Sequence, residues 1–139
     1  MPSDNDSAAE APDGLAARLE QRSVYAVATL AGSIDMGNHE RLRELLVRAL
    51  EGTRAALIVD MAGVDFCDSS GLGVFAHLAR ASRAGGTSLV VTGLRGRVAR
   101  VFDATGMFLF LYAEPNVQAA VDWLDGGRRH PLSPSADPS

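Results

Sequence analysis

The chain has 139 residues, a length that fits a single domain. Hydrophobic residues make up 47% and charged residues 22%, which is typical of a globular protein that buries a core without disulfides or metals. The one cysteine, Cys67, excludes an internal disulfide framework and a cysteine-built zinc site. No run is long and apolar enough to span a membrane, and the first residues lack the basic start of a signal peptide. We therefore expect a cytoplasmic protein.

The formal net charge of −4 comes from the N-terminal segment. Residues 1–14 hold four of the 17 acidic residues and no arginine, so the rest of the chain balances 13 Arg against the remaining 13 acidic residues. A neutral body with an acidic end argues against nucleic acid as the main partner. The four acidic residues of that segment are Asp4, Asp6, Glu10 and Asp13.

Both ends of the chain are predicted to be disordered tails. Residues 1–14 and 126–139 consist mainly of small, polar, charged and proline residues, without hydrophobic periodicity. The basic residues 128–130 could alternatively form a small contact patch. Residues 15–125 are the predicted domain.

Strand and helix patterns alternate along this domain. The expected elements are strands at 15–20 and 24–30, a helix that Asn38 caps and Gly52 ends, a strand at 56–59, a helix from Ser70 to Gly85, a strand at 88–91, a helix around 98–102 with its exit at Gly106, a strand at 108–112, and a helix with Pro115 as its first residue. The order β-β-α-β-α-β-α-β-α predicts an α/β fold, a mixed and mostly parallel β-sheet with helices packed on it.

The most informative segment, residues 65–74, follows the buried strand at 56–59 and opens the second helix. It therefore lies at the carboxyl edge of the sheet, where ligands and functional loops sit in open α/β folds. Two hydroxyls follow an aspartate there, and two glycines leave the helix start open to a large partner. Alternatively, Ser69 or Ser70 is only the N-cap of the helix. Cys67 is expected to be a small apolar filler.

The sequence does not match the motifs of common enzymes and cofactor-binding proteins. Residues 71–76 fit a loose dinucleotide fingerprint, but no acidic residue follows about 20 positions later to hold a ribose, and the chain has no lysine for a P-loop. His77 follows Ser70 by seven residues on one predicted helix, about 10 Å along its axis, which is too far to activate the hydroxyl. The three histidines lack metal-ligand spacing. We therefore predict no catalytic residue, metal or cofactor.

The sequence Asp-Ser-Ser-Gly-Leu-Gly at 68–73, after a buried strand, resembles the signature of anti-sigma factor antagonists, bacterial members of the STAS domain family. The resemblance extends over residues 15–125. Residues 32–35 match the G-x-[IL]-D segment that follows the second strand in this family, and residues 97–107 match its late helix and the exit from that helix. The resemblance implies a single STAS domain.

The resemblance also implies a phosphorylation switch. The unphosphorylated form would bind an anti-sigma factor that is a protein serine kinase, and so free a sigma factor in a stress response. The kinase would phosphorylate Ser69, and a serine phosphatase would reset it. No nucleic acid or membrane would be bound directly, and the protein would be a monomer or weak dimer. The expected partner-binding residues are Asp35, Asp68, Ser70, Gly71 and Gly73.

A phosphate on Ser69 is expected to meet free N–H groups and the positive end of the helix dipole, so that the modified domain stays folded. A bulky residue at Gly71 or Gly73 is expected to hinder the partner or the helix start more than it lowers stability. The alternative function is a non-switching STAS subunit of a stressosome-like or lipid-transport assembly. A serine hydrolase that uses Ser69 ranks third.

Overall fold

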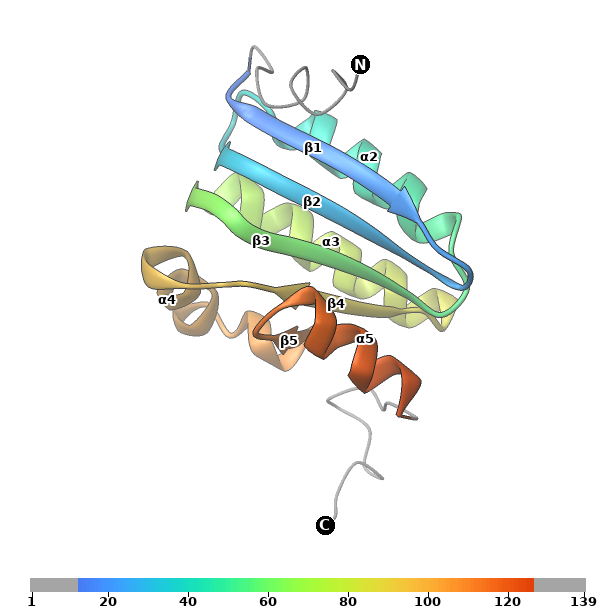
Figure 1. Ribbon diagram of the computed structural model, residues 1–139. Coiled ribbons are helices and arrows are strands. Elements are labelled where there is room, and N and C mark those ends of the chain that lie inside the picture. The colour runs from blue at the N-terminus through green and yellow to red at the C-terminus, as the bar shows by residue number, and fades with distance from the viewer. Residues whose placement is uncertain (1–12, 127–139) are drawn as a thin grey trace, which may run out of the picture.

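The computed structural model describes residues 13–126. In chain order its elements are β1 (Leu15–Gln21), β2 (Tyr25–Ile34), α2 (His39–Glu51), β3 (Ala56–Cys67), α3 (Ser69–Gly85), β4 (Ser88–Thr92), α4 (Gly96–Ala104), the 3₁₀ helix η1 (Met107–Leu109), β5 (Tyr112–Glu114) and α5 (Val117–Asp125) (Figure 1). The strands form one sheet in the order β1-β2-β3-β4-β5. The pair β1–β2 is antiparallel and the other pairs are parallel, so the predicted mixed α/β fold is confirmed.

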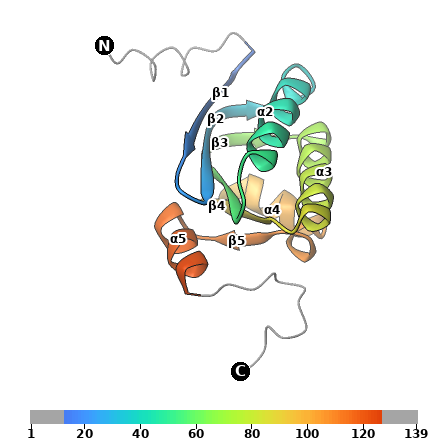
Figure 2. The same cartoon turned by 90° about the vertical axis from the view of Figure 1, so that its right-hand side faces the viewer.

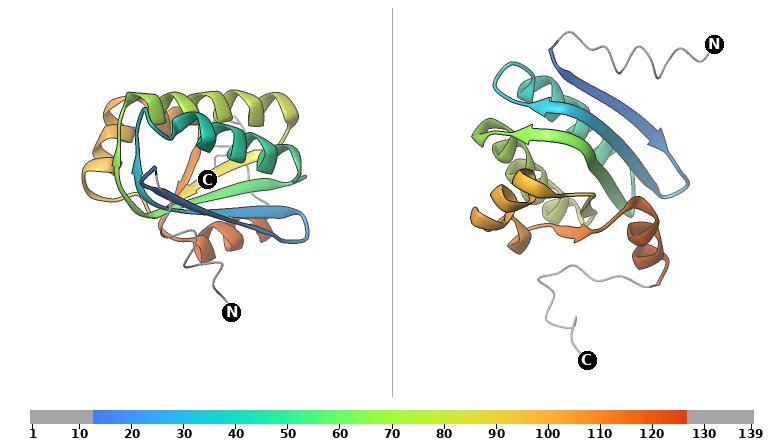
Figure 3. Two further views of the ribbon diagram at one scale, coloured as in Figure 1. Left: turned by 90° about the horizontal axis from the view of Figure 1, so that it is seen from above. Right: turned by 60° about the vertical axis from the view of Figure 1, so that its left-hand side comes forward.

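Helices cover both faces of this sheet. α2 and α3 lie side by side on one face, and α5 lies on the other (Figures 2 and 3). The apolar run at the start of β3 is buried on both faces for this reason: Leu57 and Val59 join the main core under α2 and α3, whereas Ala56 and Ile58 join a smaller core under α5. A continuous apolar run is the expected pattern for such a strand.

The second halves of β2 and β3 were not predicted from the sequence. The two strands stay paired up to Ile34 opposite Cys67, with register shifts between Thr29 and Ala31 and between Gly32 and Ser33. Such bulges break the alternation of inward and outward side chains. The sequence of these halves therefore lacks the alternating apolar and polar pattern by which a strand is predicted. The extension matters because it carries the ends of both strands to the edge where residues 65–74 lie.

The predicted strand at 108–112 is wrong. Gly106, at a φ of +76°, lies in the turn that follows α4, and η1 begins directly after it. β5 therefore begins only at Tyr112. The apolar residues of the segment have separate roles: Phe108 packs on the buried Phe102, and Phe110 is 47% exposed. A run of apolar residues that point in different directions looks like a strand in the sequence alone.

Two helix starts also differ from the prediction. Pro115 is not the first residue of α5, because Asn116 is the N-cap and its side chain accepts a hydrogen bond from the N–H of Ala119 at 2.8 Å. Asn38 occupies the N-cap position of α2, but its side chain makes no capping bond to that helix. Gly52 follows α2 as predicted.

Asp13 and Gly14, expected to belong to the N-terminal tail, form hydrogen bonds with the folded domain. The carboxylate of Asp13 accepts two hydrogen bonds of 2.7 Å from the guanidinium of Arg41, and the carbonyl of Gly14 accepts one from the N–H of Ser33. Arg41 lowers the pKa of Asp13, chiefly through these hydrogen bonds. Residues 1–12 and 127–139, with the basic patch considered at 128–130, lie outside the described residues. No helix within 13–126 has the length and apolar character to cross a membrane.

Candidate functional site

The ends of β2 and β3 bring two segments together at the carboxyl edge of the sheet (Figure 1). Ile34 pairs with Cys67 in the last rung of the two strands, and the N–H of Asp68 donates to the carbonyl of Ile34 at 3.2 Å. The loop that begins at Asp35 therefore lies beside the start of α3. Asp35 and Asp68, far apart in sequence, therefore lie at one edge of the sheet.

Asp68, rather than either serine, caps α3. Its Oδ1 accepts hydrogen bonds from the N–H of Ser70 at 2.9 Å and of Gly71 at 3.3 Å, and the hydroxyl of Ser70 also donates to it. The alternative that Ser69 or Ser70 is the N-cap is therefore wrong. Ser69 is the first residue of α3, is exposed, and its hydroxyl has no hydrogen-bond partner among residues 13–126.

Hydrogen bonding keeps the Asp68 carboxylate ionised. The hydroxyl of Ser70 is the largest cause of the lowered pKa of Asp68, the amides of Gly71 and Ser70 and the charge of His39 lower it further, and burial opposes them. A negative charge at the N-terminus of a helix also interacts favourably with the helix dipole. Asp68 thus contributes a fixed negative charge immediately next to the exposed hydroxyl of Ser69.

Replacing Asp68 with alanine will lower the free energy of unfolding by about 1 kcal/mol at pH 7, because the cap is lost. Since the folded state lowers the pKa of Asp68, its contribution is complete above the unfolded pKa of about 4 and is lost as the pH falls through the folded pKa. Thermal melts of wild type and Asp68→Ala should therefore differ at pH 7 and converge in acid. A difference that is the same at both pH values would contradict this role, and Asp103→Ala, at an exposed aspartate, is the control.

Asn38 holds the loop that carries Asp35. The buried Asn38 accepts a hydrogen bond from the N–H of Asp35 at 3.0 Å and donates to the carbonyls of Asp13 and Ser33, both at 2.9 Å. The carboxylate of Asp35 accepts from the N–H of Gly37 at 2.9 Å. These contacts replace the helix cap expected of Asn38. They fix the loop in a defined position beside Asp68.

Two exposed apolar side chains at this edge were missed from the sequence. Met36 is 77% exposed and Phe66 is 45% exposed. Met36 follows Asp35 in the loop, and Phe66 lies opposite Ser33 near the end of β3. No periodicity marks them, because one lies in a loop and the other follows a bulge. We use the name motif edge for Asp35, Met36, Phe66, Ser69 and Gly73.

The two glycines of the motif have different environments. A Cβ on Gly71 would lie 2.6 Å from the Sγ of Cys67 and 2.6 Å from the Cγ2 of Ile34, whereas a Cβ on Gly73 would meet no atom within 4 Å. Gly71 is buried and Gly73 is exposed. Gly73 also lies four residues after Ser69, so the two share one face of α3. Of the two glycines, only Gly73 leaves room for a partner.

The remaining candidate side chains are Cys67, His39 and His77. Cys67 is 6% exposed, and burial, together with the charge of Asp68, raises the pKa of its thiol to about 12, so it is the inert filler that was predicted. His39 and His77 are half-buried. Within residues 13–126, no three His, Cys, Asp or Glu side chains are grouped so that they could hold a metal ion.

Comparisons with known proteins agree with this geometry. The family model of the STAS domain matches residues 16–120. The anti-sigma-B factor antagonist of Bacillus subtilis is 38% identical over 78 residues, which are 56% of this chain and 71% of that relative. Two solved structures share the fold at 24% identity. An anti-sigma factor antagonist from Mycobacterium paratuberculosis has a TM-score of 0.71 over 83% of this chain and 97% of its own. The unphosphorylated form of the anti-sigma factor antagonist SpoIIAA has a TM-score of 0.69 over 80% and 97%.

The five-stranded mixed sheet is the fold that this chain shares with these two structures. The chain belongs to the STAS domain family and, within it, groups with the anti-sigma factor antagonists.

Proposed function

We propose that this protein is an anti-anti-sigma factor of the cytoplasm. Its unphosphorylated form binds an anti-sigma factor with serine kinase activity, which frees a sigma factor, and phosphorylation of Ser69 ends the binding. The single observation that supports this most strongly is the exposed Ser69 hydroxyl, which has no partner among residues 13–126, at the start of α3. The names of the relatives support the same role.

The hydrogen bonds favour Ser69 over Ser70 as the phosphate acceptor. The hydroxyl of Ser70 donates a hydrogen bond to the carboxylate of Asp68. Phosphorylation of Ser70 would remove this hydrogen bond and so disrupt the cap of α3. The Ser69 oxygen can accept a phosphoryl group from ATP, with ADP as the leaving group and the hydroxyl proton taken up by the kinase, without breaking a described contact. A serine phosphatase could reach the same exposed position, which completes the proposed cycle.

The off state is proposed to act through charge at the motif edge. The N–H groups of Ser70 and Gly71 already bond to Asp68, so the expectation that a phosphate finds them free is wrong. A phosphate of about −1.5 to −2 charges on Ser69 would instead lie beside the Asp68 carboxylate. A partner that accommodates one negative charge there would then meet about three.

Apolar anchoring is the second part of the proposed interface. Interface cores are enriched in Met and aromatic residues. The exposed Met36 follows Asp35 directly, and the exposed Phe66 lies two residues before Asp68. Met36→Ser should weaken binding of the anti-sigma factor about tenfold, the equivalent of about 1.4 kcal/mol. The matched control is Leu109→Ser, because Leu109 is 59% exposed but lies on η1, away from the motif edge. Titration calorimetry in which both variants bind as tightly as wild type would exclude Met36 from the interface.

The proposal is tested by capture from native lysate. Full-length Ser69→Ala and Ser69→Asp proteins serve as baits, and mass spectrometry identifies what each retains. We expect Ser69→Ala to retain a small ATP-binding kinase-like protein that Ser69→Asp loses. The same large assembly on both baits would favour the non-switching STAS subunit, because Ser69 would then not control binding. Incubation of wild type with the captured protein and ATP should phosphorylate Ser69, with Ser69→Ala as the control.

A further inference from the structure

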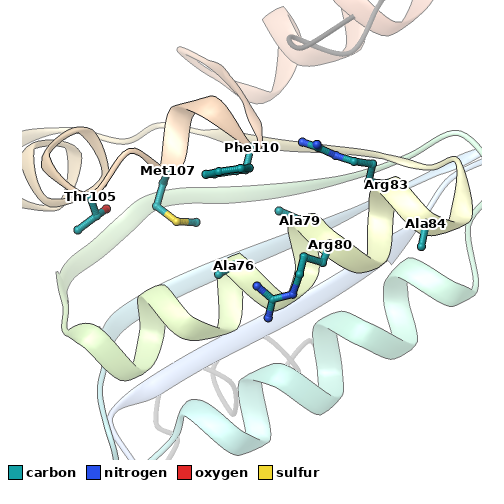
Figure 4. A pocket seen from close by; sticks show the side chains of 8 residues that line it. All are labelled: Ala76, Ala79, Arg80, Arg83, Ala84, Thr105, Met107 and Phe110. Atoms are coloured by element: carbon teal, nitrogen blue, oxygen red, sulfur yellow. The ribbon is translucent and has the colours of Figure 1, made fainter.

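A pocket of about 590 Å³ lies on the side of α3 that faces η1 (Figure 4). Its lining on α3 begins at Ala76, about 10 Å along the helix axis after Ser69 and about 4.5 Å after Gly73, so the pocket starts beside the motif edge and extends away from it to Ala84. The lining residues come from α3 and from the segment between α4 and β5. They are Ala76, Ala79, Arg80, Arg83, Ala84, Thr105, Met107 and Phe110.

Side-chain size explains why the pocket is open. α3 presents alanine at three of its lining positions, and the side chains of Met107 and Phe110 form the opposite wall (Figure 4). A volume of about 300–1,000 Å³ with an apolar lining is typical of sites for small molecules.

The charged groups of the pocket are cationic. Arg80 and Arg83 are the charged residues that line it, and no acidic residue does. Within residues 13–126, the ion pairs are Arg22–Glu20 and Arg41–Asp13, so neither of the pocket arginines is neutralised in this way. The guanidinium of Arg83 lies 5.9 Å from the ring centroid of Phe110, which places its charge next to the apolar wall.

We propose that this pocket binds a free small carboxylate with an aliphatic chain. The chain would pack on the alanines of α3 and on Met107, while the carboxylate would accept hydrogen bonds from Arg83, whose guanidinium lies over Phe110, and Arg80 would add positive charge at the rim. Arginine suits this role because its planar guanidinium matches a carboxylate in a bidentate pair. The cationic rim selects an anion, and the bounded apolar volume selects a short chain rather than a protein segment.

The test is calorimetric titration of the full-length protein with decanoate below its micelle concentration. Acetate, which lacks the chain, and decanamide, which lacks the charge, are the matched ligands. We expect decanoate to bind at least tenfold more tightly than either. Equal binding of decanoate and decanamide would overturn the proposal, as would binding to vesicles of anionic phospholipid without binding of free decanoate.

Variants assign the binding to this pocket. Arg83→Gln should weaken decanoate binding about tenfold, since a charge-assisted hydrogen bond is lost, and Ala76→Leu should abolish it by filling the space. Arg48→Gln, on α2, is the matched control and should bind like wild type. Should Ala76→Leu fail to fold by circular dichroism, Ala84→Leu fills the pocket from an exposed position. Decanoate affinity unchanged in Arg83→Gln and in the filled variant would refute the site, whatever the role of Ser69.

Discussion

Phosphorylation of Ser69 will weaken binding of the anti-sigma factor about a thousandfold and leave the folded domain intact. A thousandfold loss corresponds to about 4 kcal/mol, the scale of placing like charges together in a protein interface. The carboxylate of Asp68 is ionised and hydrogen-bonded to the amides next to Ser69, so it cannot move away from the phosphate without uncapping α3. The new charge must therefore be accommodated by the partner.

The fold should survive because Ser69 makes no contact that a phosphate would break. Its side chain is exposed, and a negative charge at the start of α3 interacts favourably with the helix dipole. We expect the melting temperature of the phosphorylated protein to stay within about 3 °C of wild type, which is less than 1 kcal/mol for a domain of this size.

Titration calorimetry with the captured anti-sigma factor measures the effect. Phosphorylated wild type is compared with unphosphorylated wild type and with Ser69→Ala treated with the same kinase and ATP. Because exposed charges are screened by salt, the loss should shrink between 0.05 and 0.5 M salt, concentrations at which the Debye length falls from about 14 to 4 Å. Full binding of the phosphorylated protein, or its unfolding, would each contradict the proposed switch.

Several parts of this molecule can be predicted from local patterns. The apolar run at the start of β3 can be predicted to be a buried strand because each face of the strand packs against a core. Gly86, at a φ of +73°, marks the end of α3, as glycine does in many helices. Residues 65–74 could be placed at the carboxyl edge because a strand and a helix flank them in sequence. Local order therefore indicates the region of the candidate site.

The shape of the site depends on contacts between distant residues, which no local pattern records. Asn38 stabilises the loop of Asp35 through the carbonyl of Asp13, 25 residues away in sequence. Bulges in β2 and β3 decide that Phe66 is exposed while Cys67 is buried. The carboxylate of Asp68 takes the capping position that a serine could equally have filled. In each case the sequence allows several partners, and tertiary packing selects one.

The two glycines of the motif will respond oppositely to alanine. Gly71→Ala should lower the free energy of unfolding by about 1–3 kcal/mol, the usual cost of overpacking a core. Its new Cβ would be too close to Cys67 and Ile34, which are 6% and 0% exposed and have little room to move. Gly73→Ala should raise stability by about 0.5–1 kcal/mol, because alanine favours the helix and no atom lies near. At Gly71 this result differs from the expectation that a larger residue impairs the partner's approach or the helix start more than it lowers stability.

Urea unfolding of the two variants and of wild type measures both changes in the free energy of unfolding. The slope of that free energy against urea concentration should be equal in all three proteins, which checks that they unfold in the same way. Cys67→Ala removes one of the two clashing atoms, so Gly71→Ala should cost less in that background, a coupling that a double-mutant cycle detects.

Binding of the anti-sigma factor distinguishes a glycine that packs in the core from one that lies in the interface. Gly73→Gln should fold normally yet bind the anti-sigma factor less tightly, since its side chain would extend over the face of α3 that Ser69 occupies. Gly71→Ala, once folded, should bind as wild type does. If Gly71→Ala were as stable as wild type and lost its partner, the packing assignment of Gly71 would be wrong, and the residue would instead belong to the surface that the anti-sigma factor contacts.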